Sequence, residues 1–237
     1  MSARNRRRHC AYCGRQKKLT TDHVPAKLFL ERPFQPNLLT VPACADCNTS
    51  FKADDEYTRT VLALDIRANW NNAAQSNLPA IIRSLQRPNA RGFAEYLGQQ
   101  SRSMKILAPN GNHVIAIETD QQRVNRSGMH ILRGLYFHET GKRLCGNRAD
   151  VRVASKAGLT AQHSDMLTIA RVFQLLPDQR NGATGTAFSY AAAFGHGRSV
   201  WLMLLYDYFF WSGSIDERDV SERELDESQP VSTDSNL

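Results

Sequence analysis

Cys10-Ala-Tyr-Cys13 and Cys44-Ala-Asp-Cys47 enclose the segment Thr21-Asp22-His23-Val24-Pro25 and are followed directly by Asn48. Each CxxC pair can direct two thiolates at one ion, and two such pairs supply the four sulfur ligands of a closed tetrahedral zinc site. We therefore expect these cysteines to bind a structural zinc ion. The 30 residues between Cys13 and Cys44 exceed what a plain zinc ribbon uses, and they hold an aspartate beside a histidine.

Prolines divide the enclosed segment into two extended pieces. Residues 19–24 precede Pro25 and read as a strand, because the residue before a proline disfavours helix. Residues 38–41 read as a second strand, which we expect Pro42 to end. Beyond Cys44 the proline and glycine signals vanish, and we expect one helix from near Cys47 to about Ile66. The pattern predicts a ββα unit in which zinc holds the start of the helix close to the hairpin.

Asp22, His23 and Asn48 are suited to hydrolysing a phosphodiester. A neutral histidine can accept a proton near neutral pH, because its ordinary pKa is about 6.5. Mg²⁺ needs only one or two protein oxygens, and Asp22 and Asn48 can supply them. Neighbours in a regular strand point to opposite faces, so Asp22 and His23 share a site only if the strand bends. The following Val24-Pro25 is compatible with such a bend.

The order CxxC, Asp-His-Val-Pro, Asn-Leu-Leu-Thr-Val-Pro, CxxC-Asn resembles the zinc-stapled branch of the HNH endonucleases, the ββα-metal nucleases. Its layout is similar to that of the endonuclease VII branch, and the resemblance covers residues 10 to about 59. It implies a metal-dependent endonuclease with structural Zn²⁺ and catalytic Mg²⁺ or Mn²⁺. His23 would be the general base, which Asn37 steadies by a hydrogen bond. Asp22 and Asn48 would be the ligands of the catalytic metal.

The last motif position departs from the family pattern. Many members have histidine where this chain has Asn48, and the sequence holds no histidine between His23 and His113. The resemblance to the endonuclease VII branch implies that Asn48 can serve as a ligand there. Alternatively, an acidic residue one or two turns along the helix reaches the metal directly or through water. The three acidic residues in question are Asp54, Asp55 and Glu56.

The distribution of charge points to nucleic acid as the partner. The net charge is +7, and residues 1–20 carry seven lysines and arginines with no acidic residue, whereas residues 216–237 are mainly acidic. A basic arm beside the motif favours phosphate binding. We expect contacts to double-stranded or branched DNA, with RNA as an alternative, from Arg6, Arg7, Arg8, Lys17, Lys18 and Lys52.

We expect an α+β chain with four parts: a nuclease domain (1–69), a helical connector (70–101), an α+β domain (102–214) and a disordered acidic tail (215–237). Within 102–214 the patterns predict a hairpin around residues 109–112, helices over 124–137 and 160–176, and strands over 150–155, 187–194 and 198–211. The last strand is expected to be buried on both faces. The role of this domain is open, and dimerisation into a homodimer or substrate recognition are both compatible with its size.

No signal peptide is evident, and the apolar run at 200–211 is too short to span a bilayer, so we expect a soluble, cytoplasmic protein without membrane contact. Reducing conditions favour zinc over disulfides for paired cysteines. Cys145 reads as a bystander thiol, and four histidines without ligand spacing read as structural: His130, His138, His163 and His196. Two alternatives to a nuclease remain. One is a zinc-stapled nucleic-acid-binding protein without nuclease activity, and the other is a structural zinc protein whose C-terminal domain does the work.

Overall fold

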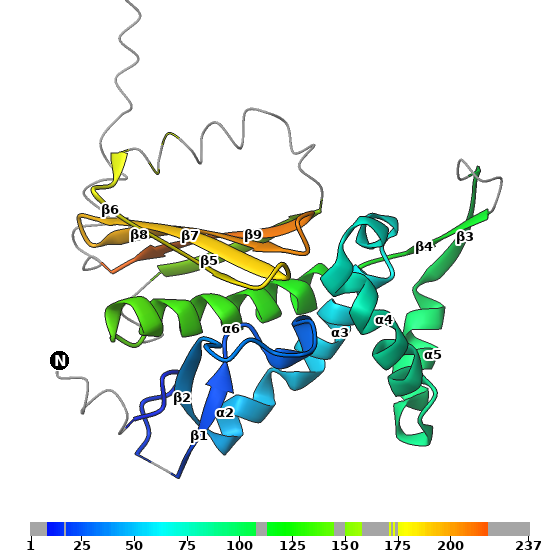
Figure 1. Cartoon of the computed structure of the whole chain (residues 1–237), viewed down its shortest axis with the longest axis horizontal. Coiled ribbons are helices and arrows are strands. Elements are labelled where there is room, and N and C mark those ends of the chain that lie inside the picture. Colours follow the sequence, from blue (N-terminus) through cyan, green and yellow to red (C-terminus); the bar gives the residue numbers. More distant parts are fainter. Residues whose placement is uncertain are drawn as a thin grey trace, which may run out of the picture.

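Helix α6 (Gln121–Thr140) lies between two layers of a mixed α+β fold (Figure 1). The N-terminal hairpin and helices lie on one side of it, and a five-stranded sheet lies on the other. This computed structural model describes residues 9–16, 18–107, 113–144, 150–157, 171, 173 and 175–217. Among the helices in those ranges, none combines the length and apolar character needed to cross a bilayer.

The N-terminal hairpin consists of β1 (Leu19–His23) and β2 (Thr40–Cys44), which pair antiparallel, with the short 3-10 helix η1 (Lys27–Phe29) in the loop between them. The expected end of the second strand at Pro42 is wrong, because β2 continues to Cys44 and Pro42 pairs with Thr21. In a two-stranded sheet each strand is an edge, where proline is tolerated. The Pro42 carbonyl also accepts a hydrogen bond of 2.7 Å from the amide of Ala11.

Two helices replace the single helix expected after Cys44. They are α2 (Ala45–Ser50) and α3 (Lys52–Ala63), and they meet at Phe51. The Thr49 hydroxyl donates to the Ala45 carbonyl at 2.9 Å, and the Ser50 hydroxyl donates to the Cys47 carbonyl at 2.9 Å. Hydroxyl groups that bond back to the preceding turn compete with the helical pattern and often bend a helix, which accounts for the interruption.

The connector is helical, as predicted. The predicted connector (70–101) comprises α4 (Asn72–Leu85), η3 (Pro88–Ala90) and α5 (Arg91–Gln99), and the 3-10 helix η2 (Ile66–Trp70) precedes it. The Asn71 side chain accepts from the amide of Ala74 at 3.0 Å and caps α4. The predicted hairpin is also confirmed, as β3 (Ser101–Leu107) and β4 (His113–Ile117) pair antiparallel, although its turn lies outside the described residues. Both this hairpin and α5 extend to one side of the molecule (Figure 1).

The C-terminal sheet has the order β5-β9-β8-β7-β6, with every neighbouring pair antiparallel. Its strands are β5 (Asp150–Ala157), β6 (Asp178–Thr184), β7 (Phe188–Gly195), β8 (Arg198–Leu205) and β9 (Phe209–Asp216). The single strand expected over 198–211 is wrong, because Tyr206 and Asp207 adopt positive φ angles of 55° and 62° and turn the chain between β8 and β9. Most of the predicted helix at 160–176 lies outside the described residues.

The sheet packs on α6 through alternating side chains rather than through a strand buried on both faces. Along β8, Trp201, Met203 and Leu205 are buried, whereas the residues between them are only partly covered. The Trp201 ring lies 6.3 Å from that of Tyr136 in α6. A continuous cluster of buried apolar side chains joins the N-terminal hairpin, α6 and the sheet. Residues from 1–69 and 102–214 therefore share one core in the described part of the chain.

Gly128 allows α6 to approach the sheet closely. A Cβ atom there would lie 2.4 Å from the Trp211 ring, and Trp211 is fully buried and donates to the Val124 carbonyl at 3.1 Å. We expect Gly128→Ala to lower the free energy of unfolding by about 1–3 kcal/mol through overpacking. Gly92→Ala in α5 meets no atom within 4 Å and should leave that free energy unchanged or raise it by up to about 1 kcal/mol. Equal urea midpoints for the two variants would contradict this packing.

Candidate functional site

The four cysteines of the CxxC pairs converge on one point. Cys10 and Cys13 lie in the turn before β1, Cys44 ends β2 and Cys47 lies in α2. Their sulfur atoms all lie within 4.8 Å of one another. The Sγ atoms of Cys13 and Cys44 are 3.7 Å apart, close to the roughly 3.8 Å that tetrahedral coordination with Zn–S bonds of about 2.3 Å requires. The cluster can hold a metal ion, and its donor set fits zinc.

The pKa values of two thiols in the cluster also favour binding of a cation. Burial raises the pKa of the Cys10 thiol, but backbone N–H groups of Cys13, Cys44 and Tyr12 outweigh it and lower the pKa to about 7. In contrast, burial and the neighbouring sulfur atoms raise the pKa of Cys47. Both directions are consistent with one cluster, because a Cys10 thiolate is stabilised by the backbone and then opposes ionisation of Cys47. A bound cation removes that opposition.

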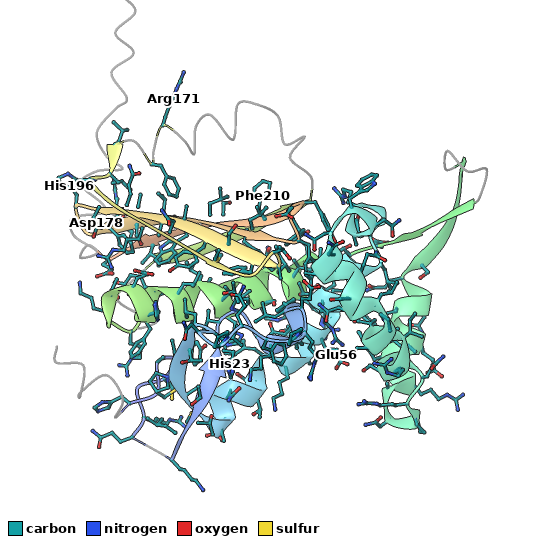
Figure 2. The ribbon with its side chains drawn as sticks, viewed as in Figure 1. His23, Glu56, Arg171, Asp178, His196 and Phe210 are labelled. Atoms are coloured by element: carbon teal, nitrogen blue, oxygen red, sulfur yellow. The ribbon has the colours of Figure 1, made fainter. Side chains whose placement is uncertain are left out.

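An open pocket of about 400 Å³ lies beside the hairpin. Asp22 and His23 both line it, although they are neighbours in β1, because the strand ends at His23 and the chain bends at Val24. Asn48 from α2 lines the same pocket. Figure 2 labels His23 and Glu56, which lie on the same side of α6 as the N-terminal hairpin. The full lining consists of Thr21, Asp22, His23, Ala26, Lys27, Leu28, Asn48, Lys52, Asp55, Glu56, Arg59 and His130.

His23 is half-buried at the edge of this pocket. Its burial lowers the pKa of the imidazole below the ordinary value, and the positive charge of Lys27 lowers it further. The negative charge of Asp22 acts in the opposite direction but does not outweigh these two effects. His23 is therefore neutral at pH 7, which is the state that can accept a proton.

Asp22 is held by two neighbours and is only 6% exposed. Its Oδ2 atom accepts a hydrogen bond of 2.6 Å from the Tyr12 hydroxyl and one of 2.9 Å from Nε2 of His130. Within the described residues no hydrogen bond reaches the other carboxylate oxygen, Oδ1. One oxygen of Asp22 is thus held by hydrogen bonds within the fold, and the other is available to bind a cation.

His130 is the site residue that sequence reasoning missed. It comes from α6, is 3% exposed and lines the pocket. Its Nδ1 atom lies 3.3 Å from Oδ2 of Asp55 in α3, while Nε2 contacts Asp22. Burial alone would lower its pKa, but the two carboxylates outweigh it and raise the pKa to about 9. The one signal in the sequence is the i, i+3 spacing of Ser127 and His130, since the Ser127 hydroxyl also donates to Asp55 at 2.5 Å.

The side chain of Asn48 is oriented by the hairpin. Its amide Nδ2 donates to the Thr20 hydroxyl at 2.9 Å, and that hydroxyl donates to the Ala43 carbonyl at 3.0 Å. The hydrogen bond engages the nitrogen of the amide, so the oxygen, which is the atom that binds cations, stays available. Thr20 and Ala43 face each other across β1 and β2, which ties Asn48 to the hairpin that bears Asp22.

The three acidic residues in the first part of α3 have different surroundings. Asp54 does not line the pocket, and its carboxylate accepts from Arg123 at 2.9 Å and from Arg126 at 2.7 Å, both in α6. Burial would raise its pKa, but these two arginines lower it. Both oxygens of Asp55 are engaged by α6. Glu56 lines the pocket and accepts from the Ser84 hydroxyl at 2.9 Å. Of the three acids, it is the one that could replace Asn48 as a metal ligand.

Basic side chains lie around the pocket. Lys27, Lys52 and Arg59 line it, and only Lys52 was expected to contact a phosphate. The Nε atom of Arg59 is buried and makes no hydrogen bond to any described residue. Lys18 is exposed just before β1 but does not line the pocket. The remaining predicted phosphate contacts, Arg6, Arg7, Arg8 and Lys17, lie outside the described residues.

Asn37 is not brought to the pocket. It is exposed in the loop before β2, and within the described part of the chain no hydrogen bond joins it to His23. The backbone near His23 is fixed instead by the amide of Val24, which donates to the Leu39 carbonyl at 2.9 Å. The expected hydrogen bond from Asn37 that steadies His23 stays a prediction.

Comparison with known proteins returned no matching family model, no matching curated protein and no matching solved structure. A function for this chain thus follows from the chemistry of the pocket and the cysteine cluster.

Proposed function

We propose that this protein is a metal-dependent HNH endonuclease that hydrolyses phosphodiester bonds of DNA. The observation that supports it best is that one pocket is lined by His23, Asp22 and Asn48, beside four convergent cysteines. These three residues are the ones to which the sequence resemblance assigns catalysis and metal binding. Lys27, Lys52 and Arg59 supply positive charge at the same pocket, as a phosphate ligand requires.

In this proposal, His23 is the general base. Its lowered pKa keeps the imidazole neutral at pH 7, so it can take a proton from the water that attacks the phosphorus atom. Asp22 and Asn48 would hold Mg²⁺ or Mn²⁺, which supplies charge neutralisation at the phosphate and the leaving oxygen. The lysines and Arg59 attract the phosphate backbone and orient it across the pocket. The cysteine cluster holds zinc, which keeps α2 and the hairpin together and takes no part in the reaction.

One observation favours a second candidate, a zinc-stapled nucleic-acid-binding protein without nuclease activity. Asp22 is 6% exposed and already accepts two hydrogen bonds. A carboxylate so engaged can have a purely structural role, in which case the basic residues of the pocket bind nucleic acid and nothing is cleaved. The two candidates agree on binding and differ on chemistry.

The two candidates are separated by cleavage assays with zinc-loaded protein from which other metals have been removed. Supercoiled plasmid, linear duplex, branched DNA and single-stranded RNA are incubated with Mg²⁺, with Mn²⁺ and without added metal. We expect cleavage of DNA only when Mg²⁺ or Mn²⁺ is present, and binding that weakens steeply as salt rises. Salt-sensitive binding without cleavage of any substrate by either metal would establish the second candidate instead.

A further inference from the structure

The pocket includes a side chain from well outside the motif. His130 belongs to α6, yet it lines the pocket together with Asp22 and Asp55, and both of its ring nitrogens contact these carboxylates. The contacts link residues 108 and 75 positions apart in the sequence. Because α6 also packs on the C-terminal sheet, His130 connects the hairpin to the other half of the molecule.

The ring of His130 has little freedom to move. It stacks on Phe51 at 4.1 Å with an interplanar angle of 7°, and the Tyr12 ring lies 5.1 Å away on a tilt of 53°. Phe51 is the residue at which α2 and α3 meet, so the interruption between the two helices provides the stacking surface. A ring fixed in this way fixes the direction of the Nε2 hydrogen bond to Asp22.

The fixed hydrogen bond from His130 matters because Asp22 is the proposed metal ligand. His130 and Tyr12 both donate to the same oxygen of Asp22, Oδ2, and so set the rotation of the carboxylate group. With Oδ2 engaged, Oδ1 is the oxygen left to face a cation. Groups that hydrogen-bond to a metal-binding side chain orient it and tune its affinity, and their loss usually costs 10- to 100-fold in metal binding.

We propose that His130 is a positioning residue for the divalent-metal site, because it orients Asp22 so that Oδ1 faces the cation. The proposal rests on the proposed function in one respect, the assignment of Asp22 as a metal ligand. It adds that residues 10–59 alone do not complete the metal site, which also requires a side chain of α6.

Two substitutions separate the two hydrogen bonds of the ring. In His130→Gln the amide nitrogen can replace Nε2 and keep the bond to Asp22, whereas in His130→Asn it can replace Nδ1 and keep the bond to Asp55. Binding of Mn²⁺ to zinc-loaded protein is followed by electron paramagnetic resonance of the free ion. We expect His130→Asn to weaken Mn²⁺ binding about 10- to 100-fold, and His130→Gln to stay close to wild type. A structural role alone predicts similar losses for both.

The controls are the zinc content and the thermal unfolding of each variant. If a His130 variant fails to fold, Tyr12→Phe removes the other bond to Oδ2 and leaves the buried charges unchanged, so weaker Mn²⁺ binding by Tyr12→Phe supports the proposal. Wild-type Mn²⁺ affinity in folded His130→Asn, or in Tyr12→Phe where His130→Asn does not fold, overturns it. Absence of Mn²⁺ binding by the wild-type protein also overturns it. If the wild-type protein binds Mn²⁺ but cleaves nothing, and His130→Asn loses that binding, the nuclease is refuted and the positioning role of His130 stands.

Discussion

Serine in place of Cys44 is expected to release the zinc ion and unfold the hairpin together with α2. Cys44 is 1% exposed and joins the end of β2 to the start of α2, so with zinc bound its sulfur would hold both elements to the turn at Cys10 and Cys13. Structural zinc contributes about 10–16 kcal/mol in zinc-finger peptides, as much as the whole stability of a typical domain. The variant should therefore lose bound zinc and unfold at lower temperature, as measured by metal analysis and circular dichroism.

Cys145→Ser is the matched control for this experiment. Cys145 is the only cysteine outside the two CxxC pairs, and it lies outside the described residues. This variant should bind zinc and unfold as the wild type does. If Cys44→Ser retained the full zinc content and an unchanged unfolding temperature, the four-cysteine staple would be refuted.

Alanine in place of His23 is expected to lower the rate of DNA cleavage by about 10²- to 10⁴-fold, the usual contribution of a general base. His23 is half-buried at the pocket and keeps a lowered pKa, so its removal leaves no equivalent proton acceptor in the same position. Zinc content, unfolding temperature and DNA affinity should change little, because no hydrogen bond of the His23 side chain to a described residue is lost. Single-turnover cleavage at saturating metal measures the effect on chemistry alone.

The matched control is His138→Ala. His138 is exposed on α6 and does not line the pocket, so this variant should cleave at the wild-type rate. Equal cleavage rates for purified His23→Ala and wild-type protein would remove His23 from the reaction. Equal losses in both variants would indicate an effect that does not depend on the pocket and would also contradict the assignment.

Local signals in the sequence predict much of this fold. Pro25 bounds β1, the turn residues at 109–112 indicate the β3–β4 hairpin, and Gly141 ends α6 with the positive φ of 68° that favours glycine. The convergence of the four cysteines also follows from spacing alone. Apart from the cysteine cluster, these features depend on interactions between residues close in the sequence.

Other features depend on contacts that spacing does not encode. The break at Phe51 arises from hydroxyl groups that read as ordinary helix positions, and its ring then serves as a stacking surface for His130. His130 itself read as structural, because nothing in its neighbourhood along the chain suggests a bond to Asp22. The turn at Tyr206 and Asp207 is not marked by glycine or proline, so one strand was expected where two exist.

Among the acids of α3, the choice left open by the sequence depends on α6. Arg123 and Arg126 hold Asp54, while Ser127 and His130 hold Asp55, and all four of these residues lie in α6. Asp55, Glu56 and Asn48 all line the pocket, but both oxygens of Asp55 are already engaged by α6. The hydrogen bond of Asn48 engages its amide nitrogen and leaves its oxygen available, so we retain Asn48 as the second metal ligand in the proposed site.

The most direct test is the rate at which zinc-loaded wild-type protein nicks supercoiled plasmid as Mg²⁺ or Mn²⁺ is titrated. The proposed nuclease predicts no nicking without added metal and a rate that rises to a plateau as the metal site fills. If protein that contains zinc and binds the plasmid produces no nicks at any concentration of either metal, the pocket of His23, Asp22 and Asn48 is not a nuclease site.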